Sequence, residues 1–151
     1  MLDHIKAKIE AEKKLDELEL EATVANLPKV LGFIDRHLEE AGCPIRVMMQ
    51  IDMAAEEIFV NIANYAYAPG KGMAKIRVDA TEDPLGVVIT FIDRGMMYDP
   101  LAKEDPDVTL SAEERKIGGL GIFLVKSTMD DITYEYSNGQ NILKLKKSFS
   151  A

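Results

Sequence analysis

The sequence predicts an α/β (α+β) two-layer sandwich, in which a mixed, mostly antiparallel sheet carries helices on one face. Three observations favour this fold class: two amphipathic helices adjacent in the chain, two pairs of apolar strands that each close around a turn, and an alternating segment near the start. In chain order the pattern is strand, helix, helix, strand, strand, irregular segment, helix, strand, strand. This order favours a sheet built from hairpins, with the helices packed on one side of it.

The first strand and the first helix follow from two different periodicities. Residues 17–22 alternate Glu with Leu and Ala, which is typical of a half-buried strand. Over residues 27–41 the apolar side chains recur at helical spacing, with Pro28 in the first turn. Asn26 is the expected N-cap of this helix, and Gly42 is the expected stop.

A second helix is expected to begin at Pro44 and to end before the helix breakers at 68–70. Its apolar stripe extends to Tyr65, which is therefore expected to be a core aromatic residue. Two strands follow, at 74–81 and 87–92, and the second is apolar enough to be central in the sheet.

The last third of the chain begins with an irregular segment. Residues 94–117 contain two prolines and little periodicity, and so long an irregular segment inside a compact domain is more often functional than filler. A third helix is expected over 119–129. A hairpin follows, with strands at 132–136 and 142–145 joined at Asn138-Gly139, a strong signal for a tight turn.

The composition bounds the class of protein. The chain has 151 residues, 47% of them hydrophobic and 29% charged, which fits one domain over 15–151 after a charged extension over 1–14 that is either helical or frayed. A net charge of −8 argues against direct binding to nucleic acid or to an anionic membrane. A single cysteine, Cys43, and the absence of a long apolar run or a secretory signal favour a cytoplasmic protein.

The second helix carries a polar stripe at the edge of its apolar face. At about 100° per residue, Glu57, Asn61 and Asn64 fall within about 60° of one another. A carboxylate and two amides that are partly desolvated there suit a metal ligand or a general base. Ordinary helix-surface polarity with incidental spacing accounts for the same pattern.

Two further segments place glycines beside polar groups. Asp93 ends an apolar strand two residues before Gly95, so its carboxylate can lie at a pocket rim, although common strand-to-turn chemistry gives the same sequence. Three glycines, Gly118, Gly119 and Gly121, lead directly into an apolar helix, whose free N–H groups favour phosphate. A purely structural tight turn is the alternative for this segment.

The order and spacing of these motifs carry more information than any one of them. They are Glu57-x-x-x-Asn61, then Asp93-x-Gly95, then Gly118-Gly119-Leu120-Gly121. This arrangement resembles the N, G1 and G2 boxes of the Bergerat ATP-binding fold, which is shared by DNA gyrase and the sensor histidine kinases. Within that histidine-kinase-like ATPase superfamily, the sequence most resembles the small serine/threonine kinases that act as bacterial anti-sigma factors. The likeness covers about residues 15–148.

The resemblance implies roles for the residues on the second helix and the central strand. Asn61 would be the Mg²⁺ ligand through its side-chain oxygen, and Glu57 would be the general base. Asn64 would add a nucleotide contact. Asp93 would accept a hydrogen bond from the adenine amino group, and Gly95 would let the base approach the backbone.

The resemblance also implies a phosphate cradle and a lid. The backbone amides of Gly118, Gly119, Leu120, Gly121 and Ile122 would hold the phosphates of ATP or ADP. Residues 101–117 would form a mobile lid, in which Arg115 or Lys116 would neutralise charge on the γ-phosphate. Tyr65 replaces the His that many relatives carry, so a nucleotide contact is an alternative to its role in the core.

The implied activity is phosphoryl transfer from Mg-ATP to a Ser or Thr of a small antagonist protein with the STAS fold. The free kinase would sequester a sigma factor, often as a homodimer. Two other interpretations stay open from the sequence. One is a non-catalytic nucleotide-binding module that works by partner exchange, and the other is a subunit of a larger signalling kinase.

Overall fold

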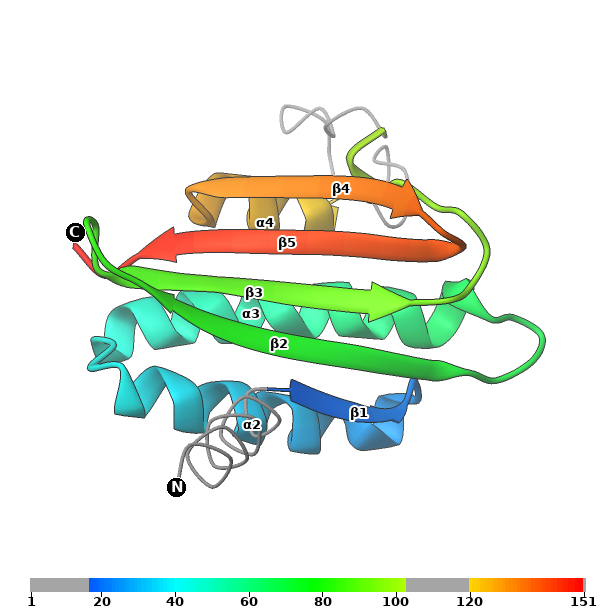
Figure 1. Cartoon of the computed structure of the whole chain (residues 1–151), viewed down its shortest axis with the longest axis horizontal. Helices are drawn as coiled ribbons and strands as arrows, with labels where there is room; N and C mark the ends of the chain where they lie inside the picture. The colour runs from blue at the N-terminus through cyan, green and yellow to red at the C-terminus, as the bar shows by residue number, and fades with distance from the viewer. Residues whose placement is uncertain (1–16, 103–119, 151) are drawn as a thin grey trace, which may run out of the picture.

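The computed structural model describes residues 17–102 and 120–150, which form an antiparallel sheet with helices on one face (Figure 1). The strands are β1 (Glu17–Glu21), β2 (Met73–Thr81), β3 (Gly86–Asp93), β4 (Asp131–Ser137) and β5 (Gln140–Ser148). Their order across the sheet is β1-β2-β3-β5-β4. The predicted sandwich is confirmed, but a mixed sheet is not what these strands form, since each neighbouring pair is antiparallel. The reason is that β5 lies between β3 and β4, which point the same way and would pair in parallel if they were neighbours.

Three helices of the described segments lie together behind the sheet in Figure 1: α2 (Leu27–Glu40), α3 (Ile45–Asn61) and α4 (Leu120–Thr128). Their apolar stripes bury against the inward-facing side chains of β2, β3 and β5, in a core that includes Ile34, Ile51, Phe59, Ile76, Ile89, Phe91 and Leu145. None of the helices described is both long enough and apolar enough to cross a bilayer. The predictions for residues 1–14, and those for 103–119, lie outside the described residues.

The start of α2 differs from the predicted cap. A 3₁₀ turn (Val24–Asn26) leads into the helix, so Asn26 already has helical backbone angles instead of the extended ones of a capping residue. Its side chain makes no cap hydrogen bond and donates Nδ2–H to the carbonyl oxygen of Glu21 at 2.8 Å. Asn26 therefore ties this turn to the end of β1.

The end of α3 also departs from a regular α-helix. After Asn61 the chain continues as a π-helical turn (Ile62–Ala66), which is wider than an α-helical turn. Side-chain directions that are predicted at 100° per residue are therefore wrong beyond Asn61. Tyr65 is 57% exposed, so the prediction of a core aromatic is wrong, and Asn64 is exposed as well.

The predicted hairpin at the end of the chain is confirmed. Asn138 and Gly139 both have positive φ, 54° and 75°, as the mirror-image turn of a tight hairpin requires. Gly42 at the end of α2 also has positive φ, 78°, which fits its predicted role as a stop.

A pair of carboxylates lies at the interface between α2 and α3. Asp35 and Asp52 each have a buried Oδ1 atom without a hydrogen-bond partner in the structure described. Burial, followed by the neighbouring Asp35 carboxyl group, raises the pKa of Asp52 to about 8. Burial, followed by the negative charges of Asp52 and Asp35, raises the pKa of the nearby Cys43 thiol. The α2–α3 interface therefore favours a protonated Asp52.

This pair predicts that stability depends on pH. The pKa of Asp52 is about 8 in the folded chain and about 4 when unfolded, so the folded state holds the extra proton between these values. Its contribution to stability is complete below pH 4 and is lost as pH rises towards 8. We expect Asp52→Asn to raise the thermal midpoint more at pH 8 than at pH 5. The exposed control Asp79→Asn should show no such trend, and equal behaviour of the two variants would contradict the interpretation.

Candidate functional site

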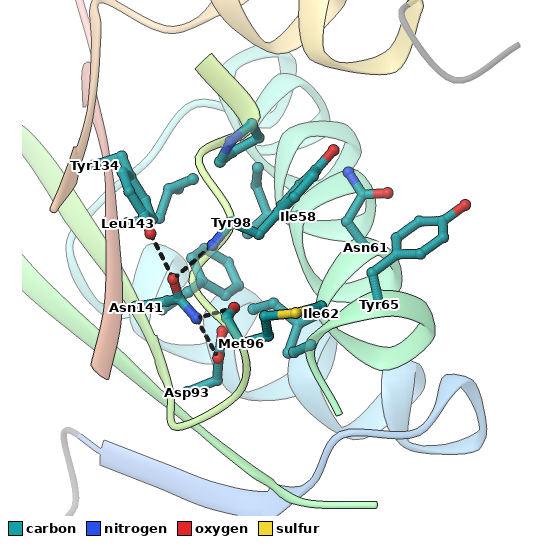
Figure 2. Close-up of a pocket in the computed structure, with 13 residues that line it drawn as sticks. Ile58, Asn61, Ile62, Tyr65, Asp93, Met96, Tyr98, Tyr134, Asn141 and Leu143 are labelled. Atoms are coloured by element: carbon teal, nitrogen blue, oxygen red, sulfur yellow. Dashed lines mark hydrogen bonds between the residues drawn. The ribbon is translucent and has the colours of Figure 1, made fainter. Parts of the chain in front are cut away.

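A cavity lies where the end of α3, the end of β3 and the hairpin β4–β5 meet (Figure 2). It encloses about 40 Å³ and has mostly apolar walls. Its polar groups come from side chains far apart in the chain. The lining residues are Ile58, Asn61, Ile62, Tyr65, Ala66, Phe91, Asp93, Met96, Tyr98, Pro100, Tyr134, Asn141 and Leu143.

Asp93 is the buried carboxylate of this cavity, with 5% of its surface exposed. It accepts hydrogen bonds at Oδ1 from the backbone N–H of Gly95 and from the side-chain amide of Asn141, both at 2.9 Å. Since both bonds end on the same oxygen, Oδ2 is the atom that Asp93 can offer to a ligand. An acceptor inside apolar walls selects a ligand that presents a hydrogen-bond donor.

Asn141 holds Asp93 in place and connects it to the loop that follows β3 (Figure 2). Its Nδ2 also donates to the carbonyl oxygen of Met96 at 2.9 Å, and its Oδ1 accepts the backbone N–H of Tyr98 at 3.2 Å. The hydroxyl of Tyr134 donates to the same Oδ1. The pKa of Tyr134 is raised, mainly by burial and further by the negative charges of Asp99 and Asp93. The hydroxyl therefore keeps its proton and can donate it in a hydrogen bond.

The loop after β3 packs against the π-helical turn without a side chain between them. Met96 donates its backbone N–H to the carbonyl oxygen of Ala66 at 2.9 Å. A Cβ atom on Gly95 would overlap that carbonyl group. Gly95 is therefore needed because two backbones approach each other closely here, a different reason from the expected approach of a ligand.

Tyr67 reinforces this contact from the next position in the chain. Its hydroxyl accepts the backbone N–H of Arg94 at 2.7 Å and donates to the carbonyl oxygen of Met73 at 2.6 Å. Its pKa is raised, chiefly by burial, so the hydroxyl keeps its proton. The end of α3, the start of β2 and the end of β3 are thereby joined through one side chain.

Glu57 and Asn61 lie one helical turn apart on α3, beside the cavity. Asn61 donates Nδ2–H to Oε1 of Glu57 at 3.2 Å, which leaves its carbonyl oxygen, Oδ1, for a cation. Glu57 lines a separate groove of about 310 Å³ between α3 and α4. A Cβ atom on Gly121 would overlap the Glu57 carboxylate, so Gly121 makes room for that group.

The structure therefore brings together several of the expected residues. Asn61 and Asp93 both line the cavity, Glu57 is hydrogen-bonded to Asn61, and Gly121 lies against Glu57. Asn64 is exposed and is not among the lining residues, because the π-helical turn displaces it.

The glycine-rich segment is only partly described. The side chain of Ile122 is buried in the core, so Ile122 can meet a ligand only through its backbone. Leu120 is the first residue of α4. Arg115, Lys116, Gly118 and Gly119 lie outside the described residues.

Sequence reasoning missed Asn141, Tyr98 and Tyr134 as parts of the site. One signal for Asn141 was present: it shares the inward face of β5 with Leu143 and Leu145, and an amide is rare at such a position. Nothing comparable marks Tyr98, because its position depends on the fold of an irregular loop.

The close approach at Gly95 gives a prediction on stability. Without a clash, Gly→Ala in a loop gains about 0.4–1 kcal/mol, but overlap with the Ala66 backbone costs about 1–3 kcal/mol. We expect Gly95→Ala to lower the free energy of unfolding in urea. Gly32→Ala is the matched control, because Gly32 lies within α2 and a Cβ atom at this position would meet nothing within 4 Å. The control should gain about 0.5–1 kcal/mol, and a gain in both variants would contradict the packing argument.

The sequence matches the family of the histidine kinase-like ATPase domain over residues 20–147. It is 26% identical over 132 residues to the serine/threonine-protein kinase BtrW of Bordetella bronchiseptica, an alignment that covers 87% of this chain and 92% of that protein. It is 30% identical over 112 residues to the serine-protein kinase RsbW of Listeria monocytogenes, with 70% and 69% of the two chains covered.

A solved structure shares the fold. The crystal structure of the RsbU and RsbW domains of Rv1364c from Mycobacterium tuberculosis aligns with a TM-score of 0.62 and 18% identity, over 89% of this chain and 33% of that one. This likeness concerns the fold alone, and the present chain spans about a third of that protein. Together with the two kinases, the domain match assigns the sequence: the chain belongs to the histidine kinase-like ATPase domain family, among the serine/threonine kinases of the anti-sigma-factor type.

Proposed function

We propose that this chain is an active cytoplasmic kinase, which transfers the γ-phosphoryl group of Mg-ATP to a Ser or Thr of a small STAS-fold antagonist. When the antagonist is phosphorylated, the kinase, as a homodimer, sequesters a sigma factor. The observation that carries the catalytic part is the hydrogen bond between Asn61 and Glu57. It joins a carboxylate beside an open groove to an amide that lines the cavity with Asp93.

The cavity fits the adenine end of ATP. Oδ2 of Asp93 would accept the exocyclic amino group of adenine, and the apolar walls would cover the ring. The enclosed space of about 40 Å³ is small beside the ~300–1,000 Å³ of typical ligand sites, so the rest of the nucleotide would extend past the exposed side chains of Tyr65 and Tyr98. Those two rings lie 6.5 Å apart at the mouth of the cavity.

The residues at the end of α3 fit a magnesium site completed by the nucleotide. Oδ1 of Asn61 is the protein oxygen that would hold the ion, since Nδ2 is occupied by Glu57. Mg²⁺ typically takes few ligands from the protein and the others from phosphate and water. When bound, the ion would supply positive charge that offsets the charge of the phosphates.

The proposed transfer uses Glu57 as the base. Its carboxylate takes the proton of the acceptor hydroxyl while the hydroxyl oxygen bonds to the γ-phosphorus. The bond from that phosphorus to the oxygen bridging to the β-phosphate breaks, and ADP leaves. Asn61 keeps the carboxylate oriented through its 3.2 Å hydrogen bond, and Gly121 leaves it the space to stay there.

Calorimetric titration with ADP and ATP, with and without Mg²⁺, tests the nucleotide site. We expect saturable binding by the wild type that Asp93→Asn loses, because the amide replaces an acceptor with a donor. Asn61→Ala should keep binding without Mg²⁺ but lose most of the gain that Mg²⁺ gives. An unchanged response to Mg²⁺ would remove Asn61 from the metal site.

Phosphoryl transfer is tested by incubating each STAS-domain protein of the source organism with the chain and Mg-[γ-³²P]ATP. We expect one of them to acquire phosphoserine or phosphothreonine. Glu57→Gln should lower the rate by about 10²–10⁴-fold while ADP binding is retained. The matched control Glu40→Gln, at the exposed end of α2, should transfer at the wild-type rate. Nucleotide binding without transfer to any STAS protein would instead favour a non-catalytic partner-switching module.

A further inference from the structure

One row of side chains on α3 leads directly to the proposed base. Ile45, Met49, Met53, Glu57 and Asn61 follow one another at intervals of four residues, so they form a continuous ridge along the helix. The first three are large apolar side chains with exposed fractions of 73%, 63% and 64%. The ridge therefore changes from exposed apolar surface to polar site within one helical turn.

The groove of about 310 Å³ between α3 and α4 lies beside this ridge. Its apolar wall includes Met53, Val60 and Leu124, and Leu124 is 45% exposed. Among the described residues that line the groove, the charged side chains are those of Glu56, which is exposed, and Glu57.

Glu57 separates this groove from the nucleotide cavity. On one side its carboxylate is joined to Asn61, which lines the cavity, and on the other side it lines the groove against Gly121. A base that removes a proton from a hydroxyl must reach that hydroxyl directly. Since the nucleotide would fill the cavity side, the groove is the approach that the described residues leave for the second substrate.

We propose that the ridge and the groove together form the docking surface for the phosphoacceptor segment of the protein substrate. The segment has apolar side chains next to its Ser or Thr and a basic residue nearby. This inference rests on the proposed kinase activity and adds to it the place where the substrate binds.

The chemistry of the surface specifies this occupant. Exposed methionines are flexible and polarisable, so they adapt to an apolar partner, and a contiguous apolar surface of this kind is typical of an interaction site. The two carboxylates give the groove a negative rim, which favours a cationic group on the partner and speeds its association.

The test compares matched variants in steady-state transfer to the STAS protein that the wild type phosphorylates. We expect Met53→Lys and Leu124→Lys each to raise KM for that protein by about tenfold or more, with kcat at saturation little changed. Met53→Leu should restore the wild-type KM. Leu85→Lys is the control, because Leu85 is 56% exposed in the turn between β2 and β3, away from the groove.

ADP titration and thermal unfolding of each variant show that the fold and the nucleotide site are intact. An unchanged KM in Met53→Lys and Leu124→Lys, with transfer by the wild type intact, overturns the docking surface and leaves the kinase activity standing. Absence of transfer by the wild type overturns the kinase activity, and the docking surface with it. Sedimentation velocity tests whether the surface is instead an interface between two copies of the chain. A wild-type dimer that Met53→Lys converts to monomer would assign the surface to a second copy and overturn the docking of the substrate.

Discussion

The site depends on the close contact between the end of α3 and the end of β3. Met96 donates its backbone N–H to the Ala66 carbonyl oxygen, and only a glycine at 95 lets the two backbones come so near. Because the contact involves backbone atoms, it has little freedom to adjust. It places Asn61, one turn before Ala66, on the same cavity as Asp93.

Polar groups buried beside an apolar core need partners, and Asn141 supplies them for most of the cavity. It donates to Asp93 and to the loop carbonyl of Met96, and it accepts hydrogen bonds from Tyr98 and Tyr134. An unpaired carboxylate at this depth would be costly. The network therefore fixes the orientation of Asp93 in the cavity and at the same time anchors the loop after β3 to the sheet.

Chemistry and recognition meet at one side chain of α3. Glu57 is held from the cavity side by Asn61 and is given space on the groove side by Gly121. At intervals of four residues towards the start of α3, the same row continues with the exposed side chains of Met53 and Met49. The helix α3 thus runs from the proposed nucleotide site to the proposed substrate surface, to which α4 adds the other wall of the groove.

The sequence by itself determined the element order, the hairpin at Asn138-Gly139 and the motif residues Glu57, Asn61 and Asp93, because these follow from local periodicity, turn chemistry and short spacing. The tertiary structure alone decided the position of β5 between β3 and β4, which excludes parallel pairing there. It also decided the π-helical turn that exposes Tyr65 and displaces Asn64, and the role of Asn141. These features depend on contacts between segments far apart in the chain, such as the pairing of Gly86 with Ser148 and the hydrogen bond between Asn141 and Asp93. No local pattern encodes which of those segments meet.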